Sequence, residues 1–212
     1  MKSAEERAPE ILKLLAKAYP DAKCELDYET PLQLLVATIL SAQCTDVRVN
    51  QLTPELFKKY PTMKAFAESE LPELEEDIRP TGFYRNKAKN IQRACLQMLA
   101  NYQGEVPETM EELTQLAGIG RKSANVLLGN CFETPGVIVD THVLRIAKRL
   151  GFSMQDNPEK LELELQKLVP QPAWTKFSTL ITIHGRRCCF SRKPACDRCP
   201  VAHLCPSANK IG

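Results

Sequence analysis

Four cysteines near the end of the sequence constrain what the chain can fold into, because their spacing brings them to one point. They read Cys189-x6-Cys196-x2-Cys199-x5-Cys205 and fall within 17 residues. Four thiolates form the ligand set of a tetrahedral structural zinc or of an iron–sulfur cluster. The long first loop suits a larger cluster, so the spacing favours [4Fe–4S] over zinc. Cys188 leaves the register open, since it could replace Cys189.

Most of the remaining sequence carries apolar residues at helical spacing. Ser3 and Glu6 form a candidate capping box for a first helix that Pro20 stops, and Asp46 is a candidate cap for a later one. Only Gly136–Val139 resembles a strand, so no alternating strand–helix pattern indicates a nucleotide-binding sheet. We therefore expect an all-α fold of many short helices. Beyond the first, they are expected over residues 31–43, 46–60, 84–102, 108–116, 121–131, 141–150, 158–169 and 173–186.

Composition limits the compartment and the partner. No apolar stretch approaches the length of about 20 residues that a membrane helix needs, and the N-terminus has no secretory pattern. We expect a cytoplasmic, reducing location without membrane contact, where clustered cysteines indicate metal rather than disulfides. The net charge of +2 does not by itself indicate a nucleic-acid partner. Bases nevertheless gather locally, with five and no acid over residues 79–93 and six against one acid over residues 184–210.

Residues 116–125, which read LAGIGRKSAN, join two expected helices through two glycines. Gly118 and Gly120 permit a tight turn and a close backbone approach to a ligand. The amide groups at the start of the second helix would then face an anion such as a DNA phosphate. The flanking helices make this a more informative signal than a Gly-x-Gly pattern alone.

Lys122 stands in the first turn of that second helix. It is either a solvated cation beside a phosphate or a nucleophile. A lysine attacks carbon only as the neutral amine, and both the helix N-terminus and the adjacent Arg121 disfavour its positive charge. The sequence alone leaves the two interpretations even.

Asp140 ends the apolar run 137–139 at an expected helix start. An N-cap is the simplest role for it. A cap also fixes the position of the carboxylate, so near Lys122 it could accept a proton or stabilise positive charge. The three histidines are expected to pack or cap rather than to bind a ligand.

Taken together, these motifs resemble the endonuclease III family of the helix-hairpin-helix DNA glycosylases, over most of the chain. The segments that carry the resemblance are residues 40–50, 82–91, 116–126, 139–151 and 184–200, together with Cys205. The resemblance implies two helical domains with a DNA-binding cleft between them. One would be a contiguous bundle over residues 24–134 that contains the helix-hairpin-helix at about 110–132. The other would join residues 1–23 to 135–212 and carry the cluster at 189–205.

The resemblance also implies the site residues. Lys122 would be the Schiff-base lysine and Asp140 its partner acid. The register of the [4Fe–4S] ligands would be Cys189, Cys196, Cys199 and Cys205.

DNA contacts are implied for a second group of residues. Gln43 would fill the hole left by a flipped base, and Phe83 would wedge into the stack where the family commonly has leucine. Ala117 departs from the proline that is usual in the hairpin. The remaining expected DNA contacts are Gly118, Gly120, Arg121, Arg192 and Lys193.

The implied function is base-excision repair by a bifunctional DNA glycosylase and AP lyase. The enzyme would remove oxidised pyrimidines from duplex DNA through a lysine Schiff base and cut 3′ to the abasic site by β-elimination. It would be a bacterial, nucleoid-associated monomer whose partner is double-stranded DNA with damaged bases or abasic sites. The alternatives are a non-catalytic or specialised damage-binding paralogue and a monofunctional adenine glycosylase. The first would need neither Lys122 nor Asp140, and the second lacks the lysine.

Overall fold

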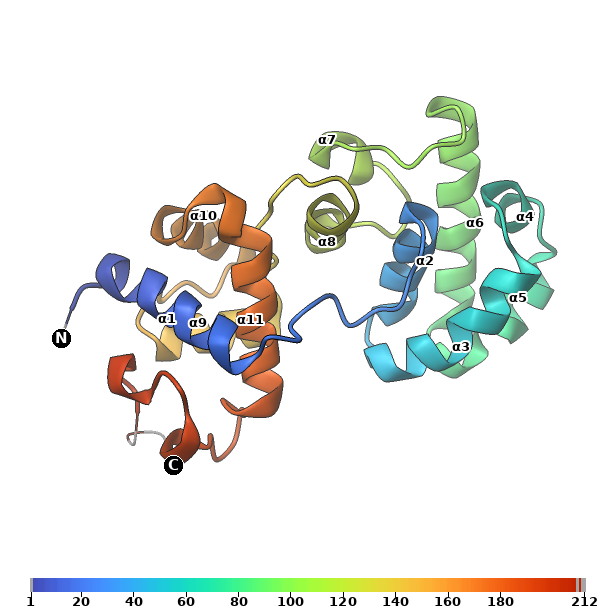
Figure 1. Cartoon of the computed structure of the whole chain (residues 1–212). Helices are drawn as coiled ribbons and strands as arrows, with labels where there is room; N and C mark the ends of the chain where they lie inside the picture. The colour runs from blue at the N-terminus through green and yellow to red at the C-terminus, as the bar shows by residue number, and fades with distance from the viewer. Residues whose placement is uncertain (1, 209, 211–212) are drawn as a thin grey trace. The chain divides into compact units, whose positions relative to one another are not determined.

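The structure is a computed structural model and describes residues 2–208 and 210. Every regular element within these residues is a helix, which confirms the all-α prediction (Figure 1). None of the described helices is both long and apolar enough to cross a bilayer. The α-helices are α1 (Ala4–Ala18), α2 (Pro31–Ser41), α3 (Asp46–Lys59), α4 (Met63–Ala67), α5 (Leu71–Asp77), α6 (Tyr84–Asn101), α7 (Met110–Leu113), α8 (Arg121–Cys131), α9 (Thr141–Arg149), α10 (Pro158–Leu168) and α11 (Trp174–Arg187). Short 3-10 helices are η1 (Arg79–Thr81), η2 (Gln171–Ala173), η3 (Cys196–Arg198) and η4 (Ala202–Leu204).

The chain divides into two compact units. The first, here called the central unit, is formed by Cys24–Thr134. The second, here called the terminal unit, is formed by Met1–Lys23 together with Pro135–Gly212. Each has its own core of buried apolar side chains. Positions 1, 209, 211 and 212 lie outside the described residues.

The central unit is built around α2. Its seven residues 34–40 are all buried, as their continuous apolar run predicts for a helix enclosed by others. Thr30 caps the helix by accepting the Gln33 N–H, and Pro31 occupies the first turn, where its missing N–H costs nothing. Helices α3, α6 and α8 pack against it. Helix α2 is therefore enclosed by three neighbouring helices.

In the terminal unit, segments from the two ends of the chain pack together. Helix α1 lies against α10 and α11, and the predicted capping box of Ser3 and Glu6 is present. Arg7 is buried and donates to the carbonyl oxygens of Leu150 at 2.6 Å and Leu204 at 3.0 Å. One guanidinium thus ties the N-terminal helix to α9 and to the cysteine-rich segment.

Helices α9 and α11 approach closely at Gly185. A Cβ atom on Gly185 would lie 2.7 Å from Nδ1 of His142 and 2.9 Å from Cδ1 of Ile146. Only glycine leaves room for this contact, although glycine inside a helix costs about 1 kcal/mol relative to alanine. The close approach brings the end of α11, where the cysteine-rich segment begins, beside α9.

The predicted strand at Gly136–Val139 is wrong, because the described residues there form no strand. The N–H of Gly136 donates to the Thr175 hydroxyl at 3.2 Å, and the N–H of Ile138 donates to the Ser178 hydroxyl at 2.9 Å. Alternate amide groups find side-chain acceptors on α11 rather than a partner strand, so the segment is satisfied without a sheet.

The end of one expected helix and the cap of another also differ from the prediction. The helix expected over 108–116 is α7 alone, because after Leu113 the backbone changes to tighter bonds such as Leu116 N–H to Leu113 carbonyl. The cap of α3 is Thr45, whose hydroxyl accepts the Arg48 N–H at 3.3 Å. Asp46 is instead the first residue of that helix, where its charge suits the helix dipole.

Candidate functional site

The hairpin between α7 and α8 is a tight turn held by two buried apolar side chains. Leu116 and Ile119 are buried, and the Ile119 N–H donates to the Leu116 carbonyl at 3.1 Å. Gly118 has φ +80, a left-handed conformation that glycine adopts without a steric penalty. Gly120 is the N-cap of α8 and provides no side-chain cap. The start of an eleven-residue helix is thus exposed without a capping side chain, the arrangement that suits an anion.

Gln97 on α6 holds the hairpin at Ala117, the position where proline is usual in the family. Its Oε1 accepts the Ala117 N–H at 2.9 Å, and its Nε2 donates to the Gln115 carbonyl at 3.1 Å. Alanine keeps the N–H that proline lacks, and this N–H is used. The sequence pattern does not reveal this role of Gln97, because no local signal links residues twenty positions apart.

Lys122 is the second residue of α8, and both it and Arg121 are exposed. Ala124 behind them is buried, so the helix is anchored while its first turn faces outward. The primary amine is therefore accessible at the helix N-terminus, as the sequence predicts.

Asp140 is the N-cap of α9, as predicted. Its Oδ1 accepts the Val143 N–H at 2.8 Å, and its Oδ2 accepts the Thr182 hydroxyl at 3.3 Å. Both carboxylate oxygens have a donor and the residue is half-buried, so the position of the charge is defined. Lys122 belongs to the central unit and Asp140 to the terminal unit.

Gln43 and Phe83 share an unusual backbone. Both have positive φ, 53° for Gln43 and 49° for Phe83, although neither is glycine. Both are exposed, and Phe83 presents 62% of its surface. A left-handed conformation at a non-glycine residue is uncommon and persists only where the surroundings hold it. An exposed aromatic ring in such a loop is available for contact with a partner.

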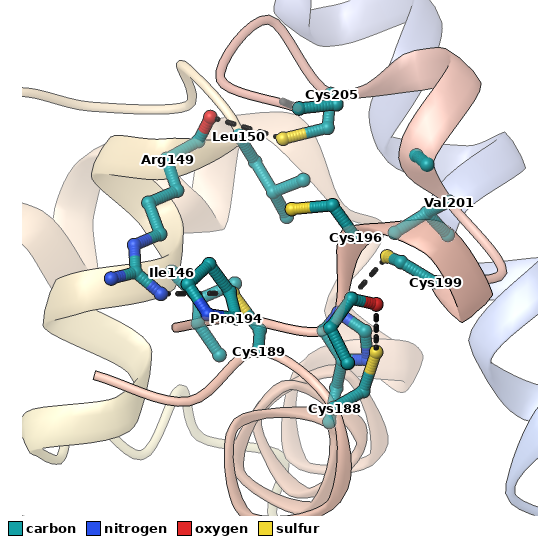
Figure 2. A pocket seen from close by; sticks show the side chains of 14 residues that line it. Ile146, Arg149, Leu150, Cys188, Cys189, Pro194, Cys196, Cys199, Val201 and Cys205 are labelled. Carbon is teal, nitrogen blue, oxygen red and sulfur yellow. Dashed lines mark hydrogen bonds between the residues drawn. The ribbon is translucent and has the colours of Figure 1, made fainter. Parts of the chain in front are cut away.

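The four predicted cysteine ligands line one pocket in the terminal unit, with Cys188 beside them (Figure 2). The pocket contains about 380 Å³ of non-atom space, part of which opens to solvent. Ile146, Leu150 and Val201 supply apolar walls. The structure thus brings together the residues that the sequence spacing selects.

The chemistry of these thiols fits a metal group. Burial raises the pKa of the Cys199 thiol to about 12 and raises the pKa of the Cys205 thiol above its ordinary value. Without a cation these thiols stay protonated and neutral. A metal centre supplies the positive charge that makes thiolates favourable, so four cysteines in an apolar pocket suit an iron–sulfur cluster.

Arg149 at the end of α9 supports the first cysteine. It donates to the Cys189 Sγ at 3.3 Å and to the carbonyls of Phe190 and Ser191 at 2.5 and 2.8 Å. An N–H donor toward a ligating sulfur stabilises a thiolate and the negative charge of a thiolate-bound cluster. Spacing alone did not single out Arg149, since its partners lie some forty residues further along the chain.

Cys188 has other contacts. It is buried, and its Sγ donates to the Ala195 carbonyl at 3.5 Å. Cys199 Sγ lies 3.6 Å from Nε2 of His184, and the ligand atoms of His184, Cys188 and Cys199 are within 4.8 Å of one another. Burial lowers the pKa of His184 to about 4, so this ring is neutral. Geometry alone therefore leaves both Cys188 and Cys189 at the pocket.

The segment between the first two cysteines forms a closed loop with basic residues at its tip. The Ala195 N–H donates to the Cys188 carbonyl at 3.0 Å and closes the base of the loop. Arg192 and Lys193 are exposed on it, and Lys193 has φ 50. The cysteine pocket thus carries a positively charged projection, a suitable contact for phosphate.

Comparison with protein families gives two matches. Residues 36–171 match the HhH-GPD superfamily of base excision DNA repair proteins. Residues 189–205 match the iron-sulfur binding domain of endonuclease III. The second match begins at Cys189 and ends at Cys205.

Relatives align over nearly the full chain. Endonuclease III of Synechocystis sp. is 56% identical over 209 residues, which are 98% of this chain and 95% of that protein. Endonuclease III of Bacillus subtilis is 42% identical, over 91% of this chain and 88% of that protein. The likeness therefore includes both units.

Solved structures agree. A non-covalent endonuclease III–DNA complex superposes with a TM-score of 0.93 at 43% identity, covering 99% of this chain and 98% of that chain. A trapped endonuclease III–DNA covalent intermediate has the same TM-score and identity and covers 99% of both chains.

Proposed function

Because the chain belongs to the endonuclease III family within the HhH-GPD superfamily of base excision DNA repair proteins, we propose that Lys122 is the nucleophile with which it excises damaged bases. The activity is that of a bifunctional DNA glycosylase and AP lyase. The observation that carries the assignment is an accessible lysine in the first turn of the hairpin helix. A relative of the same fold has been trapped as a covalent DNA intermediate.

The reaction follows from these side chains. The neutral amine of Lys122 forms a bond to C1′ of the sugar, and the bond from C1′ to the damaged base breaks. The C1′–O4′ bond of the sugar then opens, O4′ takes up a proton, and an iminium forms between C1′ and the Lys122 nitrogen. The iminium makes the C2′ proton acidic, and loss of that proton expels the 3′ phosphate by β-elimination. Asp140 accepts the proton of the amine and stabilises positive charge on the sugar. Its two hydrogen bonds hold the carboxylate in one orientation.

C1′ is accessible only when the damaged nucleotide leaves the stack. We assign Gln43 to the space left behind and Phe83 to the neighbouring base step, since both are exposed at loop positions with a left-handed backbone conformation. Gly118, Gly120 and Arg121 bind a phosphate at the hairpin. Arg192 and Lys193 bind a second stretch of the DNA backbone.

Alanine substitutions at the two hairpin glycines should affect folding stability and DNA binding separately. In Gly118→Ala the new Cβ would lie 2.9 Å from the Asn90 Cβ at positive φ, so we expect the free energy of unfolding to fall by about 2 kcal/mol. In Gly120→Ala the Cβ meets nothing within 4 Å, so stability should change by less than about 1 kcal/mol while duplex affinity falls. Urea unfolding and DNA titration measure the two effects. Wild-type affinity in Gly120→Ala would refute a close phosphate at that residue.

The chain binds a [4Fe–4S] cluster, and we assign its ligands as Cys189, Cys196, Cys199 and Cys205. The family match over residues 189–205 and the Arg149 N–H at the Cys189 sulfur support this register. A cluster bound by these four side chains would cross-link residues 189–205. We propose that it stiffens the loop that presents the two basic residues, since the reaction described above moves no electron.

Adjacent cysteines provide a matched test of the register. We expect Cys188→Ala to keep iron and sulfide at the wild-type level, because the family match begins at Cys189 and the Cys188 Sγ donates to the Ala195 carbonyl. Cys189→Ala should lose the cluster, its yellow-brown absorbance and the folded basic loop. Iron and sulfide analysis of anaerobically purified protein measures both variants. Retention of the cluster in Cys189→Ala but not in Cys188→Ala would reverse the register.

We propose oxidised pyrimidines as the excised bases, together with cleavage at abasic sites. Borohydride trapping on duplexes that carry thymine glycol, an abasic site or no damage tests chemistry and substrate together. Covalent adducts are expected on the first two duplexes and not on the third. If trapping occurs on abasic DNA but not on thymine glycol, the proposed lyase activity would stand and the proposed excision of oxidised pyrimidines would be refuted.

We place the enzyme in the bacterial cytoplasm, on nucleoid DNA. The relatives named above are bacterial proteins, which supports this location. That the chain acts as a monomer stays a prediction.

A further inference from the structure

Lys87 is a buried lysine that the reaction above does not use. It lies in the first turn of α6 and only 4% of its surface is exposed. Its Nζ donates to the Leu40 carbonyl and to the Thr81 carbonyl, each at 2.8 Å. A buried ammonium is costly unless its protons are satisfied, so this side chain is held by specific contacts.

Both acceptors belong to helix ends. Leu40 lies at the end of α2 and Thr81 at the end of η1. The last carbonyls of a helix have no partner within it and carry the negative end of its dipole. Lys87 therefore joins two helix ends that lie far apart in the sequence. Burial lowers the pKa of Lys87 below its ordinary value.

Each joined helix end leads into a loop with a residue that the proposed function assigns to DNA. Gln43 follows Leu40 by three positions, and Phe83 follows Thr81 by two. Both have the positive φ described above, and both are exposed. Such conformations need support from the surrounding structure. The hydrogen bonds of Lys87 hold the backbone three residues before Gln43 and two residues before Phe83.

We propose that Lys87 is a positioning residue that couples the Gln43 and Phe83 loops, so that the two side chains enter the DNA stack as one unit. This inference rests on the proposed roles of these two residues in base flipping. It predicts that Lys87 matters when a base must leave a duplex and not when the sugar is already accessible.

Lys87→Met tests this, because methionine fills similar space without a charge or a donor. On a duplex with thymine glycol, we expect single-turnover excision to fall about 10- to 100-fold. On a single-stranded abasic oligonucleotide, which has no stack to open, cleavage should stay within about twofold of wild type. Lys64→Met is the matched control, since Lys64 is 71% exposed and pairs only loosely with Glu68 at 3.7 Å. It should leave both rates unchanged.

A double-mutant cycle separates positioning from general stability. In a Gln43→Ala, Phe83→Ala background, Lys87→Met should cause no further loss of excision, because the residues it positions are gone. If thermal melting shows that Lys87→Met does not fold, the same double-mutant cycle is measured with Lys87→Gln. The glutamine amide keeps two hydrogen-bond donors, although its reach is shorter.

The outcomes are distinct. Equal losses on duplex and single-stranded DNA, or additive losses in the cycle, would show that Lys87 only stabilises the fold. Wild-type excision by a folded Lys87 variant would also overturn the inference. A wild-type protein that neither traps nor cleaves abasic DNA would instead refute the proposed function, and the inference with it.

Discussion

Lys122→Gln should abolish both strand cleavage and the borohydride-trapped adduct, a loss on the order of 10⁴-fold or more. Glutamine keeps a polar side chain of slightly shorter reach but has no nucleophilic amine. Damaged duplex DNA should still bind, because the hairpin backbone and the start of α8 are unchanged. Gel analysis after borohydride treatment measures the adduct, and a binding titration measures the affinity.

Lys64→Gln is the control for this change, since it removes an exposed lysine from α4 without touching the hairpin. It should trap and cleave like the wild type. If Lys122→Gln still cleaves abasic DNA at the normal rate and still traps, the nucleophile is another amine. Lys122 would then be the phosphate-side cation that the sequence also allowed.

Asp140→Asn should slow base excision by on the order of 10²-fold or more while some trapping remains. Asparagine is as good an N-cap as aspartate, so its oxygen can still accept the Val143 N–H and α9 should keep its start. What disappears is the negative charge that assists the amine and stabilises the sugar cation. Single-turnover kinetics on a damaged duplex measures the rate, and thermal melting checks the cap.

Thr182→Val serves as the comparison for the Asp140 substitution. It removes the hydroxyl that donates to Oδ2 but leaves the charge, so we expect less than about a tenfold loss. An Asp140→Asn enzyme with the wild-type rate would reduce Asp140 to a helix cap. A large loss of melting temperature in that variant would mean that the cap, rather than the charge, had been disturbed.

Most helices could be predicted, because their signals are local. The cap and proline of α2, the capping box of α1 and the glycines before α8 each act within a few residues of the backbone they organise. The predicted strand at Gly136–Val139 failed because its amide groups found hydroxyls on α11, some forty residues away. No pattern within the strand itself carries that information.

The site divides in the same way. Spacing indicated a four-cysteine metal site, although the family resemblance was needed to choose Cys189 over Cys188. The turn residues indicated the hairpin with Lys122 at its helix start. Asp140 could be recognised as a cap because an N-cap bond spans only three residues.

The sequence by itself thus determined the helical class, the hairpin, its exposed lysine and the cysteines that meet at one pocket, because short-range backbone geometry and ligand spacing are written in consecutive residues. Only the tertiary structure decided which side chains hold these parts in place. Gln97 braces the hairpin, Arg149 supports the Cys189 loop and Lys87 joins two helix ends. Each makes hydrogen bonds to backbone or sulfur atoms distant in the chain, and such partners are defined only when the packed helices bring them within reach.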